Sequence, residues 1–212
     1  MQAKSQFSKE SFKAAPVVGI LRGNDIDTIN WVTHIYESCG FSTLEITMNT
    51  PNFSTIVAGL IRDFPNLNIG AGTVCDKQEL QTALDAGAAF IVTPNLDEEV
   101  INLCVKDDVP IFPGAYTPSE VYRAWSLGAT AVKLFPATQL GVQFIRDIKG
   151  PFPQIKLLPT GGVSKDNIKD FFDAGVVGVG MGSSLFPKEI LQSKDLDLLT
   201  EHLSDIKRKV LP

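Results

Sequence analysis

Short apolar stretches alternate along the whole chain with longer stretches in which apolar and polar residues mix. Several of the short stretches are apolar on both faces, which is typical of parallel strands that helices cover. They predict eight strands, over residues 17–21, 43–47, 68–71, 90–92, 110–112, 131–134, 155–158 and 176–179. The amphipathic stretches predict helices over residues 26–38, 52–63, 77–86, 98–106, 119–126, 142–147, 167–173 and 196–209.

Four glycines mark the passage from a predicted helix to the next strand. Gly40, Gly87, Gly128 and Gly175 each follow a helical stretch, where a glycine can take the left-handed conformation that closes the last turn. They are 47, 41 and 47 residues apart, and each interval holds two strand–helix units. This quasi-repeat predicts a closed (β/α)₈ barrel, with an open doubly wound sheet as the alternative.

A single domain accounts for the chain, because 212 residues suffice for a minimal barrel and no linker or shift in composition interrupts them. We therefore assign residues 1–212 to one barrel. Residues 1–14 are mostly polar and lack the apolar core of a signal peptide. We expect them to form an extra helix that closes the bottom of the barrel.

The charge of the chain gives no sign of a polyanionic partner. The net charge is −5, and no long basic run favours nucleic acid or an anionic membrane. No apolar run is long enough to span a membrane. The three cysteines are scattered, which indicates reduced thiols and a cytoplasmic location. Any anionic substrate must therefore be held by local features.

Lys133 is the strongest chemical signal, because it lies inside the apolar run at 131–135. Lysines are rarely buried, and burial in a dry site lowers the pKa of the amine toward the neutral form that acts as a nucleophile. The alternatives are a lysine that reaches water from the strand end, or one that pairs with an acid. Lys156 is a rival lysine, but it lies at the start of its strand, at the face opposite the expected active site.

Glu45 is the natural partner for Lys133. It lies on the second predicted strand and Lys133 on the sixth, and alternate strands of a barrel feed the same interior layer. The carboxyl could move protons during imine formation and carbon–carbon cleavage. A nearby carboxylate favours the charged amine whereas burial opposes it, so a structural ion pair is the alternative.

Two glycine-bearing segments follow the seventh and eighth predicted strands. They are residues 160–164, with Gly161 and Gly162, and residues 180–184, with Gly182 and Ser183. The corresponding loops of many barrels bind phosphate through backbone N–H groups. The pair predicts a phosphate site.

Two further classes of site find little support in the sequence. The chain has only two histidines, and no cluster of histidine, cysteine or acidic residues has the spacing of a metal site. No glycine-rich dinucleotide fingerprint opens the first crossover. We therefore expect neither a catalytic metal nor a dinucleotide.

These residues, taken in order, resemble the bacterial 2-keto-3-deoxy-6-phosphogluconate (KDPG) aldolases, which overlap with the 4-hydroxy-2-oxoglutarate (KHG) aldolases. The resemblance covers nearly the whole chain. It rests on Leu21-Arg22-Gly23, Leu44-Glu45-Ile46-Thr47, Gly70-Ala71-Gly72-Thr73-Val74, Pro113-Gly114, Thr117-Pro118-Ser119-Glu120, Lys133-Leu134-Phe135-Pro136-Ala137 and Pro159-Thr160-Gly161-Gly162-Val163.

The resemblance implies a homotrimeric class I aldolase that uses neither metal nor cofactor beyond a covalent imine on Lys133, with Glu45 as general acid and base. It implies substrate-binding positions at Arg22 and Thr73 near the keto acid, at Pro94, Phe135 and Thr160 along the pocket, and at Gly161, Gly162, Gly182 and Ser183 around the phosphate. Several members carry an arginine where this chain has Asn49, so Arg22 is expected to supply that charge.

The implied reaction cleaves 2-keto-3-deoxy-6-phosphogluconate to pyruvate and glyceraldehyde 3-phosphate, with 4-hydroxy-2-oxoglutarate as a further substrate. Asn49 and the run at 93–95 are also similar to the 6-phosphogalactonate branch, so the epimer at C4 stays open. A sugar-phosphate isomerase barrel or a non-catalytic phosphosugar-binding barrel would use the same phosphate loops. Trapping with pyruvate would separate the aldolase from both.

Overall fold

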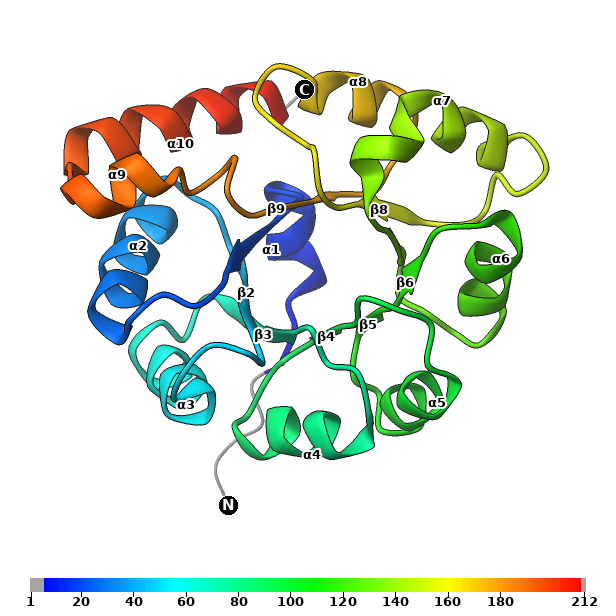
Figure 1. Ribbon diagram of the computed structural model, residues 1–212, viewed down its shortest axis with the longest axis horizontal. Helices are drawn as coiled ribbons and strands as arrows, with labels where there is room; N and C mark the ends of the chain where they lie inside the picture. Colours follow the sequence, from blue (N-terminus) through cyan, green and yellow to red (C-terminus); the bar gives the residue numbers. More distant parts are fainter. Residues whose placement is uncertain (1–5, 211–212) are drawn as a thin grey trace.

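The computed structural model describes residues 6–210, and its strands form a curled parallel sheet (Figure 1). The strands are β1 (Val17–Leu21), β2 (Thr43–Thr47), β3 (Asn68–Gly72), β4 (Ile91–Val92), β5 (Ile111–Phe112), β6 (Gly114–Ala115), β7 (Val132–Leu134), β8 (Leu157–Pro159) and β9 (Val179–Met181). Six pair in the order β5-β4-β3-β2-β1-β9, and three in the order β6-β7-β8. A bridge between Thr160 and Gly180 connects the two groups beyond β8.

Helices surround the strands on the outside (Figure 1). They are α2 (Ile26–Ser38), α3 (Phe53–Asp63), α4 (Lys77–Asp85), α5 (Glu98–Lys106), α6 (Pro118–Ser126), α7 (Ala137–Lys149), α8 (Ile168–Asp173), α9 (Lys188–Ser193) and α10 (Leu196–Val210). The result is a TIM-barrel-like α/β fold, in which the carboxyl ends of all strands face one side. No helix of the described part is long and apolar enough to cross a membrane.

Local signals in the sequence explain where many helices begin and end. Asp25, Asp76, Asp97 and Thr117 lie just before α2, α4, α5 and α6, and each side chain accepts a hydrogen bond from the backbone N–H three residues on. The helix-ending glycines behave as predicted: Gly40, Gly87, Gly128 and Gly175 have φ of 75°, 91°, 99° and 88°.

Most predicted strands match the observed ones within two residues at each end, and two differ in a way that the structure explains. The strand expected at 110–112 continues as β6 beyond Pro113, whose missing N–H interrupts the ladder. The strand expected at 176–179 begins only at Val179. Residues 176–178 instead pass the N-terminal helix, where a Cβ on Gly178 would lie 2.6 Å from the Phe12 ring.

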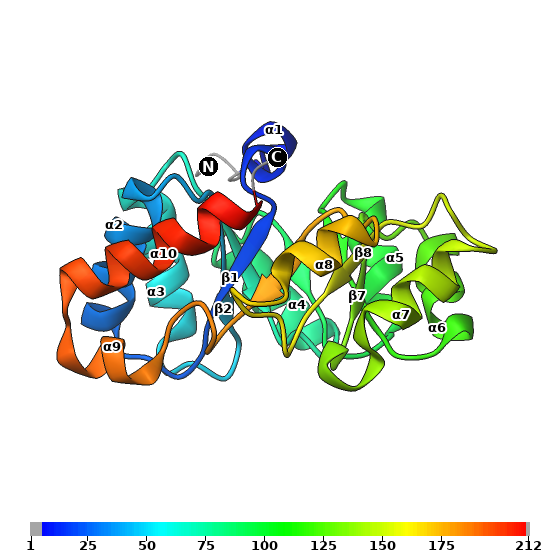
Figure 2. The ribbon, with the colours of Figure 1, turned by 90° about the horizontal axis from the view of Figure 1, so that it is seen from above.

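The N-terminal segment packs against the amino-terminal end of the sheet (Figure 2). Helix α1 covers Lys9–Ala14, and residues 1–5 of the predicted 1–14 extension lie outside the described part. Phe7 and Phe12 pack against Phe90 and Phe112, with ring centroids 5.5 to 6.3 Å apart for the pairs that contact. These aromatic rings pack at the end of the curled sheet that lies opposite the predicted active site.

Candidate active site

Lys133 lies in the middle of β7 and its side chain is buried, with 5% of the residue exposed. Its backbone is in register with Gly114 on β6 and Leu158 on β8. The Nζ atom lies 4.9 Å from the centre of the Phe135 ring, which covers it from the loop side. The rival Lys156 is exposed and precedes β8, so it is not a buried amine.

Glu45 is buried in β2, with 1% of the residue exposed. Among the residues at 6–210, neither Glu45 nor Lys133 takes part in an ion pair within 4.0 Å. The direct salt bridge that would make this pair purely structural is therefore absent from the described part. Each group affects the pKa of the other, which places them in one electrostatic environment.

Burial is the largest cause of the pKa shifts of both groups. Desolvation lowers the pKa of the Lys133 amine; Glu45 opposes this shift and Arg22 adds to it. Desolvation likewise raises the pKa of the Glu45 carboxyl, against the opposing effect of Lys133 and then Arg22. Both shifts favour the uncharged forms, a nucleophilic amine beside a carboxylic acid that can donate a proton.

Gly72 provides the space that the Glu45 carboxyl occupies. A Cβ on Gly72 would lie 1.6 Å from Glu45 Oε1 and 2.1 Å from Cδ, closer than any real contact. The two residues lie on neighbouring strands, with Glu45 in register with Gly70 and Thr47 in register with Gly72. The sequence pattern placed Gly72 at a strand end but did not assign it this role.

Arg22, Asn49 and Thr73 are joined at the ends of β1, β2 and β3. Arg22 donates from Nη1 to Asn49 Oδ1 at 3.3 Å and from Nη2 to Thr73 Oγ1 at 3.2 Å. Thr47 Oγ1 also donates to Asn49 Oδ1, at 2.8 Å. Thr73 has a φ of 59°, which turns the chain directly after β3. Asn49 and Thr73 thus orient the Arg22 guanidinium through two hydrogen bonds.

The strand ends on the other side of the barrel bring together the predicted glycine loop and pocket wall. Thr160 follows β8 and is 6% exposed, and its carbonyl accepts from the Ala137 N–H at 2.9 Å. Gly161 and Gly162 have φ of 87° and 79°, a conformation that favours glycine. A Cβ on Gly161 would lie 3.8 Å from the Phe135 ring.

Pro94 follows β4, and its carbonyl carbon and oxygen would lie 2.4 and 2.3 Å from a Cβ on Gly114. Gly114 is the β6 residue in register with Lys133. The backbone of Pro94 therefore lies one strand away from the lysine strand, close to the predicted site.

Gly182 and Ser183 follow β9 and line a cavity of about 750 Å³ together with Arg22. Neither Lys133 nor Glu45 lines this cavity, which is bounded by the end of β1, the turn after β9 and helix α9. The sequence pattern gave no sign of its outer wall, which includes Asn24 and the α9 residue Lys188. Helix α9 was not predicted, because its six residues are too few to establish a helical period.

Groups of three or more residues suited to bind a metal ion are lacking within residues 6–210. The cysteines of this part of the chain are free, and Cys75 is exposed on the loop after β3. It lies close enough to Lys133 for each group to affect the pKa of the other. The polar groups at the ends of the strands thus include an amine, a carboxyl, a guanidinium and a thiol.

Comparison with known proteins agrees with this geometry. A family model described as KDPG and KHG aldolase matches residues 9–202. The chain belongs to this aldolase family. Its members are carbon–carbon lyases of class I, which act through a Schiff base without a metal. Membership argues against both the sugar-phosphate isomerase and the non-catalytic barrel.

Two relatives in the aldolase family are named for different sugar acids. The chain is 37% identical to the 2-dehydro-3-deoxy-phosphogluconate aldolase of Pseudomonas aeruginosa, over 74% of this chain and 71% of the relative. It is 33% identical to the 2-dehydro-3-deoxy-6-phosphogalactonate aldolase of Escherichia coli K12, over 81% of this chain and 84% of the relative. The family is thus shared by enzymes named for both sugar acids.

A solved aldolase structure has the same fold and a covalent intermediate. The KDPG aldolase of Legionella pneumophila, with pyruvate captured at low pH as a covalent carbinolamine, superimposes with a TM-score of 0.86. It is 30% identical, and the match covers 93% of this chain and 96% of that one. A carbinolamine forms when an amine adds to a ketone, which is the reaction expected of Lys133.

Proposed function

We propose that this aldolase cleaves 2-keto-3-deoxy-6-phosphogluconate to pyruvate and glyceraldehyde 3-phosphate, with Lys133 as the Schiff-base amine and Glu45 as the general acid and base. One observation carries the proposal: a buried lysine and a buried carboxyl share one environment in which desolvation favours the uncharged form of each. An amine must be uncharged to attack a ketone, and a carboxyl must be protonated to help expel water.

The reaction begins when the Lys133 amine attacks the C2 ketone to form a carbinolamine. Glu45 gives a proton to the carbinolamine hydroxyl, which leaves as water, and a protonated imine remains. The Glu45 carboxylate then takes the proton of the C4 hydroxyl, the C3–C4 bond breaks, and its electrons form the enamine. Glyceraldehyde 3-phosphate leaves, C3 is protonated, and water releases pyruvate from Lys133.

The substrate is proposed to lie across the mouth of the barrel. Arg22 and Thr73 bind the carboxylate next to the ketone, and Asn49 holds Arg22 in place through its hydrogen bond of 3.3 Å. The phosphate binds the backbone of the two glycine-bearing loops, at 161–162 and at 182–183. Pro94, Phe135 and Thr160 form the wall between the two ends. Binding the phosphate far from the reacting bond holds the substrate in the reactive position.

Two further substrates follow from the same site. The enzyme is proposed to cleave 4-hydroxy-2-oxoglutarate to pyruvate and glyoxylate, since only the keto-acid end takes part in bond cleavage. The 6-phosphogalactonate epimer is the second candidate for the main substrate. Asn49 favours it, because this residue and the run at 93–95 are similar to that branch. Relatives of both names resemble this chain to a similar degree.

We further propose that the curled sheet closes into a complete (β/α)₈ barrel, in which β5 and β6 count as one strand and α1 is an N-terminal extension. Residues 1–212 act as one domain in the cytoplasm and assemble as a homotrimer. Chromatography with light scattering tests the trimer.

The decisive assay of the proposal is cleavage of the purified substrates, with pyruvate measured as the common product. We expect the wild type to release pyruvate from the phosphorylated gluconate acid, and Lys133→Met to release none. Comparing kcat/KM for the two C4 epimers separates the two sugar acids. A wild type that releases no pyruvate from either epimer or from 4-hydroxy-2-oxoglutarate would refute the proposed function.

A further inference from the structure

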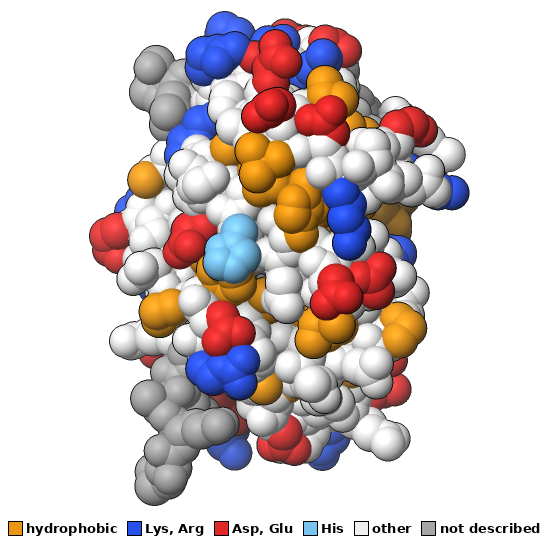
Figure 3. Space-filling view, turned by 90° about the vertical axis from the view of Figure 1, so that its left-hand side faces the viewer, with side chains coloured by type: hydrophobic (Ala, Val, Ile, Leu, Met, Phe, Trp, Pro, Cys, Tyr) orange, Lys and Arg blue, Asp and Glu red, His pale blue; other side chains and the backbone are white. Residues whose placement is uncertain are grey.

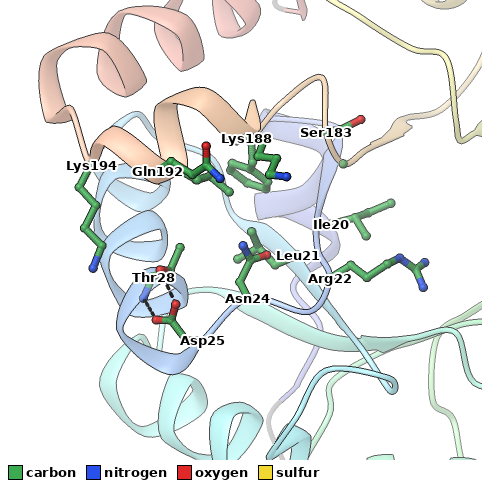
Figure 4. A pocket seen from close by; sticks show the side chains of 13 residues that line it. Ile20, Leu21, Arg22, Asn24, Asp25, Thr28, Ser183, Lys188, Gln192 and Lys194 are labelled. Atoms are coloured by element: carbon green, nitrogen blue, oxygen red, sulfur yellow. Dashed lines mark hydrogen bonds between the residues drawn. The ribbon is translucent and has the colours of Figure 1, made fainter.

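The cavity of about 750 Å³ extends from the phosphate end of the site toward helix α9. Asn24, just after β1, points toward Lys188 and Gln192, which form the α9 wall of the cavity, whereas the Arg22 side chain points away from them (Figure 4). The substrate contacts proposed above use only Arg22 and the 182–183 loop of this lining. The α9 wall has no assigned role.

The charged residues that line the cavity are Arg22, Asp25, Lys188 and Lys194, and they have different neighbours. Asp25 accepts hydrogen bonds from Thr28 N–H at 2.8 Å and from Thr28 Oγ1 at 2.9 Å, as the cap of α2. The backbone hydrogen bond from Thr28 lowers the pKa of Asp25, and the nearby Lys194 contributes in the same direction. Neither Lys188 nor Lys194 takes part in an ion pair within 4.0 Å among residues 6–210, and of the two only Lys194 contributes to the pKa shift of Asp25.

One face of the molecule is drawn by side-chain type in Figure 3. On the face shown in Figure 3, acidic and basic side chains lie among hydrophobic ones without a broad field of one sign. The whole chain carries a net charge of −5. An anion is therefore not attracted by the protein as a whole, and a free cation inside a pocket determines where it binds.

The segment between the phosphate loop and Lys188 is held by hydrogen bonds. The N–H groups of Leu185 and Phe186 both donate to the Gly182 carbonyl at 2.9 Å. Ser184 Oγ donates to the Val163 carbonyl at 2.5 Å, which ties this turn to the loop that carries Gly161 and Gly162. The turn thus has a fixed shape, and its residues Gly182 and Ser183 line the same cavity as Lys188.

We propose that Lys188 is a specificity-determining residue, which adds a cation to the phosphate end and favours phosphorylated keto acids over shorter unphosphorylated ones. The inference rests on the proposed function for the position of the phosphate. A phosphate on the 182–183 loop borders the cavity that Lys188 faces. The distal carboxylate of 4-hydroxy-2-oxoglutarate ends nearer to the bond that breaks, so it benefits less from this cation.

The experiment compares Lys188→Ala and Lys188→Arg with the wild type and with Lys106→Ala, which removes an exposed cation from α5. The first readout is the ratio of kcat/KM for the phosphorylated gluconate acid to kcat/KM for 4-hydroxy-2-oxoglutarate. We expect Lys188→Ala to lower this ratio roughly fivefold, as befits one solvent-accessible charge pair. Lys188→Arg should restore most of the ratio, and Lys106→Ala should leave it unchanged.

The second readout does not depend on turnover: it is the rise in Tm that inorganic phosphate produces by binding the folded state. Lys188→Ala should reduce this rise. An unchanged substrate ratio and an unchanged phosphate effect in Lys188→Ala would overturn the inference and leave the aldolase proposal intact. A wild type without turnover, but with phosphate stabilisation that depends on Lys188, would refute the aldolase and still support the anion contact. Absence of both turnover and phosphate stabilisation in the wild type would overturn both.

Discussion

The Glu45 carboxyl lies against the Cα of Gly72 on the neighbouring strand, where a Cβ would come within 1.6 Å of Oε1. Both residues lie on strands whose every residue is buried. Strand pairing fixes the two backbones relative to each other, so the carboxyl cannot move away from Gly72 without disturbing the packing of the core. The position of the proposed acid and base thus depends on a residue that has no side chain.

Gly72→Ala is expected to displace the Glu45 carboxyl and lower kcat by about 10²-fold or more, the contribution typical of a positioned general acid or base. The added methyl group should also lower the free energy of unfolding by about 1–3 kcal/mol, because it overpacks the core. Steady-state cleavage assays and urea unfolding measure the two effects.

Gly59→Ala is the matched control, because a Cβ there meets nothing within 4 Å in helix α3. It should stabilise the protein by about 0.5–1 kcal/mol, since alanine favours a helix interior. Its kcat should equal that of the wild type. If Gly72→Ala retained full activity, Glu45 could not be held by this contact as we describe.

The carboxylate end of the substrate is tested at Arg22. Arg22→Ala should lower kcat/KM by about 10- to 100-fold, the loss of a charge-assisted hydrogen bond. Asn49→Ala should have a smaller effect in the same direction, since it removes only one acceptor that orients Arg22. Asn66→Ala, in the exposed turn before β3, is the control. Equal activity in Arg22→Ala and the wild type would remove Arg22 from the site.

Burial of Lys133 should make the free energy of unfolding depend on pH. Its pKa is lowered in the folded state from the ordinary value of 10.5, so the unfolded chain binds the extra proton between the two values. Stability that depends on Lys133 is therefore full above about pH 10.5 and is lost as the pH falls toward the folded pKa. The slope is at most about 1.4 kcal/mol per pH unit.

Urea unfolding of Glu45→Gln and of the double variant Glu45→Gln/Lys133→Met measures this dependence without titration of the partner. The variant that keeps Lys133 should gain stability relative to the double variant as the pH rises from the folded-state pKa toward about 10.5. Parallel pH profiles would mean that the amine of Lys133 titrates as an exposed lysine does.

Removal of metal ions tests the class of chemistry. Class I chemistry on Lys133 should be insensitive to a strong chelator, because the imine and not a metal withdraws electrons from the breaking bond. Cleavage assays before and after dialysis against the chelator measure this. Loss of activity that added divalent metal restores would point to a metal-stabilised enolate.

Much of this site could be predicted from the sequence because its signals are local. Lys133 and Glu45 interrupt apolar strands, and both proved to be buried. The glycines that end helices correctly predicted that a strand follows each of them. The apolar run at 176–179 gave the wrong start for its strand. Val176 and Val179 are both buried, but the strand begins only at Val179.

The remaining features depend on contacts between distant segments. The role of Gly72 follows from strand register, and that of Asn49 follows from the direction of the Arg22 side chain. Lys188 lies on a helix too short to show a period, and only the folded chain brings it to the cavity that Gly182 and Ser183 line. No pattern within a single element reports any of these three contacts.

Borohydride trapping with pyruvate tests the central claim most directly, by locating the covalent bond. Wild-type protein treated with pyruvate and borohydride, digested and analysed by mass spectrometry, should carry one reduced pyruvate on Lys133. Lys156→Ala should be labelled like the wild type, and Lys133→Met should remain unlabelled. An active preparation in which Lys133 stays unmodified, or in which another lysine carries the adduct, would contradict the account.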